Sequence, residues 1–255
     1  MIYAAENTQY HIGVQNGSIG RYVILPGDPG RVERIAQRLQ SPEKIAQNRE
    51  YCSYRGKLCG ETVSVISTGI GGPGAAIALE ECVNAGADTF IRIGTCGAMQ
   101  EEILGGDLII ATGAVRMEGT TREYAPLEYP AVADLRVTNA LIEAAKERND
   151  RYHAGVVQSK DSFYSQHSPE TKPVHDELTA KWDAWKRMGC LASEMESAAL
   201  FIVGAYRRVR VGACFLVMAN QEREKAGLDN PVVHDTDAAI DLGVAAMSRL
   251  IRGDE

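Results

Sequence analysis

The sequence predicts an α/β protein built around a mostly buried sheet. Short runs rich in β-branched residues alternate with longer segments of helical period, which is the pattern of strands and helices that follow one another along a chain. The 255 residues are 45% hydrophobic and 24% charged, an ordinary composition for a globular protein. Because this length suits one large domain and neither a linker nor a repeat interrupts it, we expect a single domain over residues 1–255.

The first third of the chain is expected to contain three strands and two helices. The apolar, β-branched run at 22–25 is ended by a Pro-Gly-Asp-Pro-Gly turn at 26–30. Apolar residues with helical spacing follow, a Gly-Glu pair then separates two runs of strand character, and a glycine-rich turn opens the second helix. The predicted elements are strands at 21–25, 51–58 and 62–67 and helices at 32–39 and 75–84.

The rest of the chain continues the alternation of strands and helices. Each further strand is a short apolar run, and the helices show an apolar period or, at 181–188, a charged surface. The polar segment at 160–167 is expected to be a loop. The predicted elements are strands at 88–93, 107–115, 152–159 and 209–218 and helices at 137–147, 181–188, 194–206 and 237–251.

Charge and cysteine usage exclude several functional classes. The 34 acidic and 27 basic residues give a net charge of −7, which argues against binding to nucleic acid or to an anionic membrane. The six cysteines form no CxxC pair, so we expect free thiols in a reducing compartment. No stretch approaches the ~20 apolar residues of a membrane span, and the start of the chain lacks a signal-peptide pattern. These observations predict a cytoplasmic protein.

Glycine-rich turns mark the places where a ligand could bind, because ligands of open α/β sheets lie beyond the carboxyl ends of the strands. The turn at 26–29 can present backbone N–H groups to an anion, or can be a tight turn only. The segment at 69–74 matches GxGxxG, but Gly94 stands where a dinucleotide site has an acidic residue. Since a GxxxxGK[ST] segment is also missing, the sequence supports neither a dinucleotide nor a P-loop nucleotide.

Arg92 is the most informative single residue, because it lies within an otherwise apolar strand. A buried guanidinium carries a desolvation cost that only a partner can offset. The partner is either one of the acidic side chains or an oxyanion ligand, which arginine can bind through two parallel hydrogen bonds. Thr95 can add a hydroxyl group, and Arg31 and Arg49 can add positive charge, although each arginine alone is consistent with a surface position.

Two further groups have a structural and a functional interpretation. Glu194 and Glu196 lie near the start of a helix, where carboxylates stabilise the helix dipole, or where one of them can bind the hydroxyl groups of a sugar. Phe163 and Gln166 in the polar loop offer a stacking face and an amide, which suit a heterocyclic base.

Taken together, five motifs resemble the hexameric nucleoside phosphorylases, with the uridine-specific members the nearest. They are LPGDPGR at 25–31, NREY at 48–51, STGIGGP at 67–73, RIGTCG at 92–97 and EMES at 194–197. The resemblance runs from about Tyr10 to the last helix. It implies a three-layer α/β/α fold with a mixed, distorted and partly closed central sheet, and dimers that build a homohexamer with each active site shared across a dimer interface.

The resemblance also implies a role for individual residues. The catalytic residues would be Arg92, Glu196 and Gln166. The phosphate site would comprise Gly27, Arg31, Arg92 and Thr95, with Arg49 from the neighbouring subunit. The ribose site would comprise Thr95, Met195 and Glu196, with His11 from the partner subunit at the 5′-hydroxyl. The base would contact Phe163, Gln166 and Asn220.

The base site departs from the uridine-specific pattern in two places. Those relatives have Gln-x-Arg in the polar loop, whereas His167 and Ser168 follow Gln166 here. They also have an arginine after the late-strand asparagine, whereas Gln221 follows Asn220. Purine-specific relatives have an aspartate at the asparagine position, and the amide here cannot donate a proton in that way, although it can hydrogen-bond a 6-oxo group. Whether His167 contacts substrate stays open.

The family also has a monovalent cation at the dimer interface, near the positions of Glu50 and Ile70. The serine expected beside them is Gly74, so a potassium ion there stays an open alternative. We expect no other metal and no cofactor, with inorganic phosphate as co-substrate.

The implied reaction is uridine plus phosphate giving uracil and ribose 1-phosphate. Three different functions stay open beside it: a purine nucleoside phosphorylase that acts on 6-oxopurine nucleosides, a nucleosidase that uses water, and a non-catalytic nucleoside-binding protein.

Overall fold

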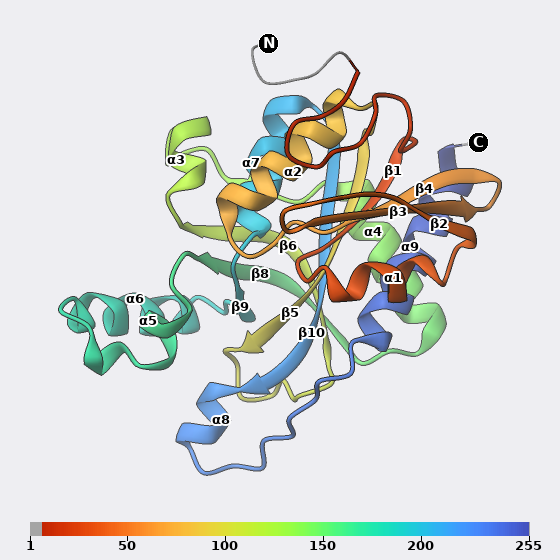
Figure 1. Cartoon of the computed structure of the whole chain (residues 1–255). Coiled ribbons are helices and arrows are strands. Elements are labelled where there is room, and N and C mark those ends of the chain that lie inside the picture. The colour runs from red at the N-terminus through yellow and green to blue at the C-terminus, as the bar shows by residue number, and fades with distance from the viewer. Residues whose placement is uncertain (1–6, 255) are drawn as a thin grey trace.

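The computed structural model describes residues 7–254, and in this part of the chain ten strands form one mixed sheet with helices on both faces (Figure 1). The strands are β1 (Tyr22–Pro26), β2 (Gln40–Asn48), β3 (Tyr51–Leu58), β4 (Glu61–Ile66), β5 (Thr89–Ala98), β6 (Leu108–Met117), β7 (Ala131–Val132), β8 (Tyr152–Lys160), β9 (Ala192–Glu194) and β10 (Arg210–Asn220). The helices are α1 (Gly30–Ala36), α2 (Gly72–Asn84), α3 (Thr120–Tyr124), α4 (Leu135–Arg148), α5 (Phe163–His167), α6 (His175–Arg187), α7 (Ser197–Arg207), α8 (Gln221–Lys225) and α9 (Asp237–Asp254).

The sheet is partly closed on itself. Its order is β10-β6-β8-β9-β5-β1-β4-β3-β2, and β10 pairs with β5 as well as with β6. The strands β5, β10, β6, β8 and β9 therefore form a ring, and β1 to β4 extend from β5 as an open sheet. Parallel pairs such as β1 with β5 occur beside antiparallel pairs such as β10 with β6. The expected mixed, distorted central sheet is confirmed.

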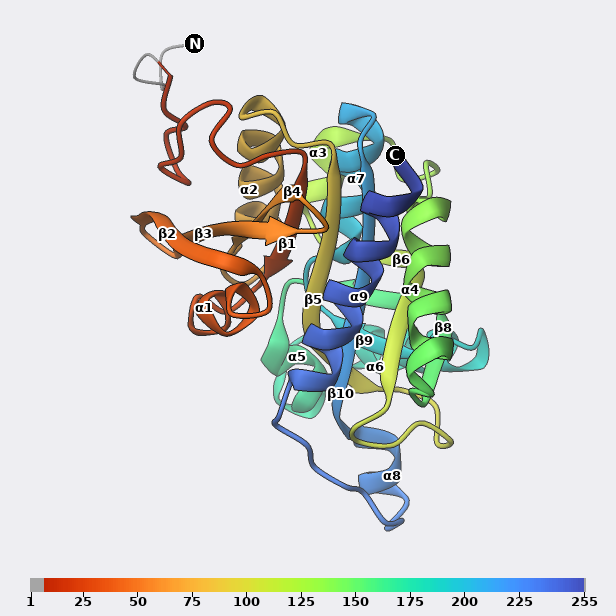
Figure 2. The ribbon, with the colours of Figure 1, turned by 90° about the vertical axis from the view of Figure 1, so that its right-hand side faces the viewer.

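Alternation along the strands divides the interior into two hydrophobic cores. In β1, Val23 and Leu25 face the core beneath α2 and α7, whereas Tyr22 and Ile24 face the core beneath α1, α4 and α9. This is the two-residue period of a strand that is buried on both faces. Figure 2 shows α4 and α9 running side by side over their face of the sheet. The result is the predicted three-layer α/β/α arrangement.

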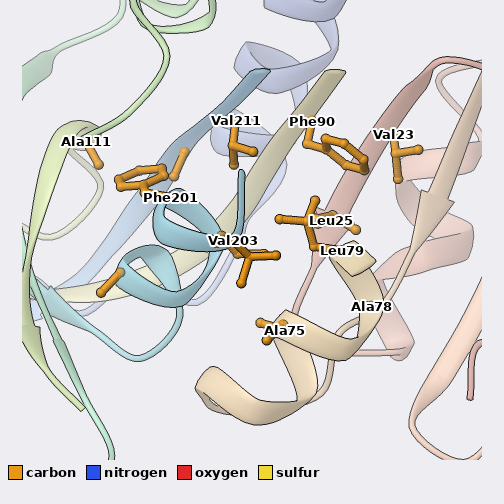
Figure 3. Packing of buried hydrophobic residues seen from close by; sticks show 14 of the residues in the cluster. Val23, Leu25, Ala75, Ala78, Leu79, Phe90, Ala111, Phe201, Val203 and Val211 are labelled. Carbon is orange, nitrogen blue, oxygen red and sulfur yellow. The ribbon is translucent and has the colours of Figure 1, made fainter. Parts of the chain in front are cut away.

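The core beneath α2 and α7 joins small helical side chains to larger ones from the strands (Figure 3). Ala75 and Ala78 let α2 approach the sheet closely, and Phe90 of β5 fills the space beside Leu79. Phe201 of α7 is 1% exposed and packs in the same cluster. Because the start of α7 carries acidic residues of the site described below, this packing also fixes their position.

Several element boundaries differ from the prediction. The strand β2 was not predicted, because it is mostly exposed, polar and contains Pro42, and so lacks an apolar pattern. The strand predicted at 88–93 runs from Thr89 to Ala98 as β5, because β10 pairs with it as far as Ala98. The helix predicted at 194–206 begins at Ser197, since Glu194 belongs to β9. The predicted loop at 160–167 contains the short helix α5, and α6 begins at His175 rather than at 181.

The structure can be compared with the expectations about the cysteines and about membrane spans. All six cysteines are free thiols, and every one except Cys59 is buried. None of the helices within residues 7–254 has both the length and the apolar content needed to span a bilayer.

Replacing Phe201 by alanine is expected to lower the free energy of unfolding by about 3–5 kcal/mol, because it leaves a cavity in the core beneath α7. Met188→Ala is the control, since that side chain is 85% exposed and its loss should change stability by less than about 0.5 kcal/mol. Urea denaturation of both variants measures the difference. Equal stability of the two variants would contradict the assigned packing.

Candidate functional site

One cavity of about 790 Å³ gathers most of the residues that the sequence analysis singled out. It lies beyond the carboxyl ends of β1 and β5, between the turn after β1, helix α5 and the start of α7. This is where an open α/β sheet binds its ligands. The predicted residues that line it are Gly27, Arg31, Thr95, Arg92, Phe163, Gln166, Met195 and Glu196.

The guanidinium group of Arg92 is buried in the wall of this cavity. The residue is 4% exposed, and its Nη2 donates to a carboxylate oxygen of Glu196. Its Nε lies 3.6 Å from Glu194 Oε2, beyond hydrogen-bond distance. Both Nε and Nη1 are buried without a hydrogen-bond partner. Arg92 therefore satisfies both interpretations of the sequence: it forms a buried ion pair and keeps two free donors for a ligand.

Arg31, in the first turn of α1, adds a second guanidinium to the same wall. Its Nη1 is also buried without a hydrogen-bond partner, and its Nε lies 3.6 Å from Asp28 Oδ2. Burial lowers the pKa of Arg31, and the positive charge of Arg92 lowers it further, whereas Asp28 raises it. Two cations this close repel each other, so an anion bound between them would relieve the repulsion.

Gly27 puts no side chain against the buried Arg92 guanidinium. A Cβ at this position would lie 3.7 Å from Arg92 Nη1, 3.8 Å from Nη2 and 3.2 Å from the carbonyl oxygen of Gly69. Any longer side chain there would occupy the space in front of the free donors. The glycine of the turn after β1 therefore keeps room for a ligand.

Glu194 and Glu196 hold the negative side of the site. Glu194 ends β9 and accepts hydrogen bonds from the backbone N–H groups of Glu196 and Ser197 and from the Ser159 hydroxyl. Glu196 accepts a hydrogen bond of 2.7 Å from the backbone N–H of Gly71, in the glycine-rich turn that precedes α2. Burial raises the pKa of Glu196, as does the nearby Glu194, while Arg92 lowers it.

A chain of polar side chains runs along the α5 side of the cavity. Lys160, at the end of β8, donates from Nζ to Ser193 Oγ at 2.7 Å, and the single Ser193 hydroxyl proton is shared between Gln158 Oε1 at 2.5 Å and Gln166 Oε1 at 2.6 Å. Gln166 Nε2 in turn lies 3.3 Å from Gln221 Oε1. Ser193 and Gln221 therefore hold the Gln166 amide in place at the cavity before a ligand binds.

An aromatic face completes this side. Phe163 is 49% exposed at the cavity, and the His167 ring lies against it at an angle of 38°, with ring centres 4.3 Å apart. His167 also lines the cavity, and burial, followed by the charge of Lys160, lowers its pKa. The exposed phenyl ring, with the imidazole beside it, offers an aromatic face for a heterocycle.

Asn220 does not belong to the cavity, contrary to its predicted contact with the base. Its side chain is fully buried, and its amide nitrogen donates to the backbone carbonyl oxygens of Gln100 and Ile103. Its Oδ1 caps α8 by accepting hydrogen bonds from the backbone N–H groups of Glu222 and Arg223. With donors and acceptor all engaged, this amide has a structural role. The next residue, Gln221, lines the cavity instead.

His11 and Arg49 also lie outside this chain's own cavity lining, and they lie near each other. The amide of Asn48 donates to the carbonyl oxygen of His11 at 2.8 Å, and Arg49 follows Asn48 at an exposed turn. His11 Nδ1 is 2.6 Å from Glu81 Oε1, which also accepts from the backbone of His11. The two predicted partner-subunit residues thus form one group on the surface.

Sequence reasoning missed Lys160, Ser193 and Gln221 as site residues. Lys160 was placed at the start of a polar loop, because it follows Gln158 and Ser159, and only the structure shows that it ends β8 and is buried. Ser193 and Gln221 gave no signal of their own, because a serine and a glutamine are ordinary surface residues and only the fold brings them to Gln166.

At the cation position that the resemblance implies, Gly74 lies close to the backbone of Thr68. A Cβ at Gly74 would lie 2.7 Å from the carbonyl oxygen of Thr68, so the backbone leaves no room for the expected serine. Within residues 7–254, histidine, cysteine, aspartate and glutamate side chains form no cluster of three or more that could hold a metal ion.

In chemical terms, the cavity has an anion-binding end and a heterocycle-binding end. Arg31 and Arg92 offer three buried donors without partners, and Glu196 lies between them and the polar chain from Lys160 to Gln166. A ligand that fills the cavity would carry an oxyanion at one end, a group with hydroxyls in the middle and a flat ring at the other.

Comparisons with known proteins agree with this geometry. The model of a family described as the phosphorylase superfamily matches residues 21–252. The chain is 56% identical over 254 residues to a uridine phosphorylase of Treponema pallidum, covering 100% of this chain and 98% of that protein. It is 46% identical to a uridine phosphorylase of Thermococcus kodakarensis, over 87% of this chain and 81% of that protein. It is 41% identical to a guanosine phosphorylase of Halorubrum lacusprofundi, over 83% of this chain and 83% of that protein.

Replacing Arg31 by glutamine is expected to weaken the binding of inorganic phosphate about 10–100-fold, because a hydrogen bond to a charged group contributes roughly 1.5–3 kcal/mol. Arg34→Gln, one turn later in α1, is the matched control, since Arg34 pairs with Asp235 and Asp237 outside the cavity. Titration calorimetry with phosphate compares the two. Equal affinities would show that Arg31 does not contact the anion.

Proposed function

The chain belongs to the phosphorylase superfamily, and on this premise we propose that it is a nucleoside phosphorylase that converts uridine and phosphate to uracil and ribose 1-phosphate. The observation that carries the proposal is the pair of guanidinium groups with buried, unpartnered donors beside Glu196. A dianion and a sugar hydroxyl are the groups that such a pair and such a carboxylate would bind side by side.

The proposed reaction is a displacement at C1′ of the ribose. The bond from C1′ to the base nitrogen breaks with its electron pair leaving on the base, and a phosphate oxygen forms the new bond to C1′. Arg31 and Arg92 would hold the phosphate at C1′, where its charge stabilises the positive charge that develops on the sugar. Because these guanidinium groups can neutralise the dianion, the proposed reaction uses neither a metal nor an organic cofactor.

Glu196 would bind the ribose hydroxyls. Its Oε1 already accepts from Gly71 and its Oε2 from Arg92, and each carboxylate oxygen has a second lone pair for a hydroxyl donor. Met195 and Thr95 line the cavity next to it. Since the same carboxylate contacts Arg92, it would set the distance between the sugar and the bound phosphate.

The base end supports two nucleoside classes. The Gln166 amide, oriented by Ser193, can bind the adjacent C=O and N–H groups of uracil, and those groups also occur in a 6-oxopurine. The uridine phosphorylase relatives favour uracil. The relative named guanosine phosphorylase supports action on 6-oxopurine nucleosides, as does the arginine missing after Gln166.

A nucleosidase and a non-catalytic binding protein have less support from the site. A nucleosidase would use water and would have no need for two guanidinium groups with unpartnered donors. A non-catalytic binding protein would have no need for a charged site whose burial is costly. We also propose a cytoplasmic location, because free thiols are the usual state of cysteine there.

We further propose that the chain works as a dimer, built into a hexamer, with a site completed by the partner subunit. His11 and Arg49 form one surface group outside their own chain's cavity lining, where they can reach a neighbour's site. Ile70 lines the cavity and is 81% exposed, a cost in apolar surface that a subunit interface would remove. The partner subunit's Arg49 would then contact the phosphate, and the partner subunit's His11 would contact the 5′-hydroxyl of the ribose.

A substrate panel tests the proposed activity. Uridine, thymidine, inosine, guanosine and adenosine are each incubated with and without phosphate, and free base and ribose 1-phosphate are measured. We expect uridine to give the highest kcat/KM, with base release only when phosphate is present. A preference for guanosine or inosine would favour a purine nucleoside phosphorylase, and release of base without phosphate would favour a nucleosidase. If no nucleoside gives a product, a non-catalytic nucleoside-binding protein is the remaining alternative.

Mixing two inactive variants tests the shared site. Arg92→Ala damages the site of its own chain, and His11→Ala combined with Arg49→Ala damages the site of the neighbour. A hybrid dimer of the two carries one intact site, so an equal mixture, dissociated and reassembled, should regain about a quarter of the unmodified activity. If the mixture stays at the mean of its inactive components, each site is built from one chain only.

A further inference from the structure

Lys160 is a buried cation that the proposed reaction has not yet used. The residue is 5% exposed at the end of β8, and its Nζ donates to Ser193 Oγ at 2.7 Å. Among residues 7–254 no carboxylate oxygen lies within 4 Å of this Nζ, although the lysine faces the cavity. Burying an ammonium ion without a paired carboxylate is costly, and proteins keep such a group mainly where it acts.

The position of this ammonium group relative to the base-binding residues is specific. It lies 5.9 Å from the centre of the Phe163 ring and is linked through Ser193 to the Gln166 amide. Lys160, Gln166 and Gln221 also line a second cavity of about 300 Å³, whose wall includes Trp182 and Trp185. Lys160 therefore lies in a wall between two cavities, where its burial makes its charge act more strongly than in water.

We propose that Lys160 is a further catalytic residue, whose ammonium group binds a carbonyl oxygen of the departing base and stabilises its negative charge. This inference rests on the proposed phosphorolysis. When the bond from C1′ to the base breaks, the electron pair stays on the base and spreads onto its carbonyl oxygens. An ammonium has three N–H donors, of which Ser193 takes one, so donors remain for that oxygen.

The charge of Lys160 also accounts for the arginines that are missing from this base site. His167 and Ser168 stand where the uridine-specific pattern has an arginine, and Gln221 stands at the position of the other. Lys160 lies beside Gln166 and Gln221 in the wall of the same cavity, but it comes from the end of β8, whereas the missing arginines would lie next to α5 and on α8. A single cation from a different strand would thus replace the lost positive charge.

The protonation of Lys160 falls within an accessible pH range. Burial lowers its pKa to about 8, and the nearby carboxylates of Glu194 and Glu196 oppose that shift. The remaining titratable or charged groups that face it or share its cavities are Cys96 and Arg92 of β5, His167 of α5, Asp183 of α6, Lys225 and Glu224 of α8, its neighbour Asp161 and, at the far end of the larger cavity, Asp28, Arg31 and Glu50. Since the ammonium form is the active one, kcat/KM should fall as the pH rises through about 8.

The test compares Lys160→Met with Lys160→Arg, using whichever nucleoside the unmodified enzyme cleaves best. At pH 7 we expect Lys160→Met to lower kcat about 100-fold or more, with the KM for phosphate changed less than about threefold, because the arginines at the other end are intact. Lys160→Arg should retain more activity and lose the fall near pH 8, since arginine stays protonated. Urea denaturation verifies that both variants are folded.

A leaving-group comparison separates charge stabilisation from a structural role. For an enzyme that cleaves uridine, 5-fluorouridine has a more acidic base and so needs less help in leaving, and Lys160→Met should lose less activity with it than with uridine. An equal loss with both nucleosides, or an unchanged kcat, would overturn the proposal. Failure of the unmodified enzyme to cleave any nucleoside with phosphate would instead overturn the proposed function.

Discussion

The burial of the Arg92 guanidinium is the constraint on which the rest of the site depends. A buried ion carries a desolvation cost of several kcal/mol, and only well-placed partners offset it. Glu196 and Glu194 supply that charge, and they are held in turn by backbone N–H groups at the glycine-rich turn before α2 and at the start of α7. Elements far apart in the sequence are thus arranged around one side chain, two of whose buried nitrogens have no hydrogen-bond partner.

The two ends of the cavity are held in place by different interactions. At the anion end, charged groups are placed by a turn and a strand, and their sequence motifs match those of the related phosphorylases. At the base end, the contacts come from α5, β9 and α8, and a chain of hydrogen bonds from Lys160 to Gln221 sets their orientation. Changes of substrate class would therefore be expected at the second end, where no buried ion pair fixes the neighbouring backbone.

Much of the fold could be predicted from the sequence, because most strands are apolar runs ended by glycine or proline turns. Arg92 could be identified for the same reason, as a charge within such a run. The exposed strand β2 has no apolar pattern to reveal it, and the extension of β5 depends on pairing with β10, a contact over more than 100 residues of sequence. Asn220 was misassigned because its partners, the backbone oxygens of Gln100 and Ile103, are brought to it only by the fold.

The central claim is that Arg31 and Arg92 bind one phosphate together. A crystal structure at saturating phosphate tests it most directly. We expect the ion in front of Gly27, with its oxygens within hydrogen-bond distance of Arg31 Nη1 and of Nε or Nη1 of Arg92, the donors that now have no partner. Phosphate bound by only one of these arginines, or at a different place in the molecule, would contradict the account.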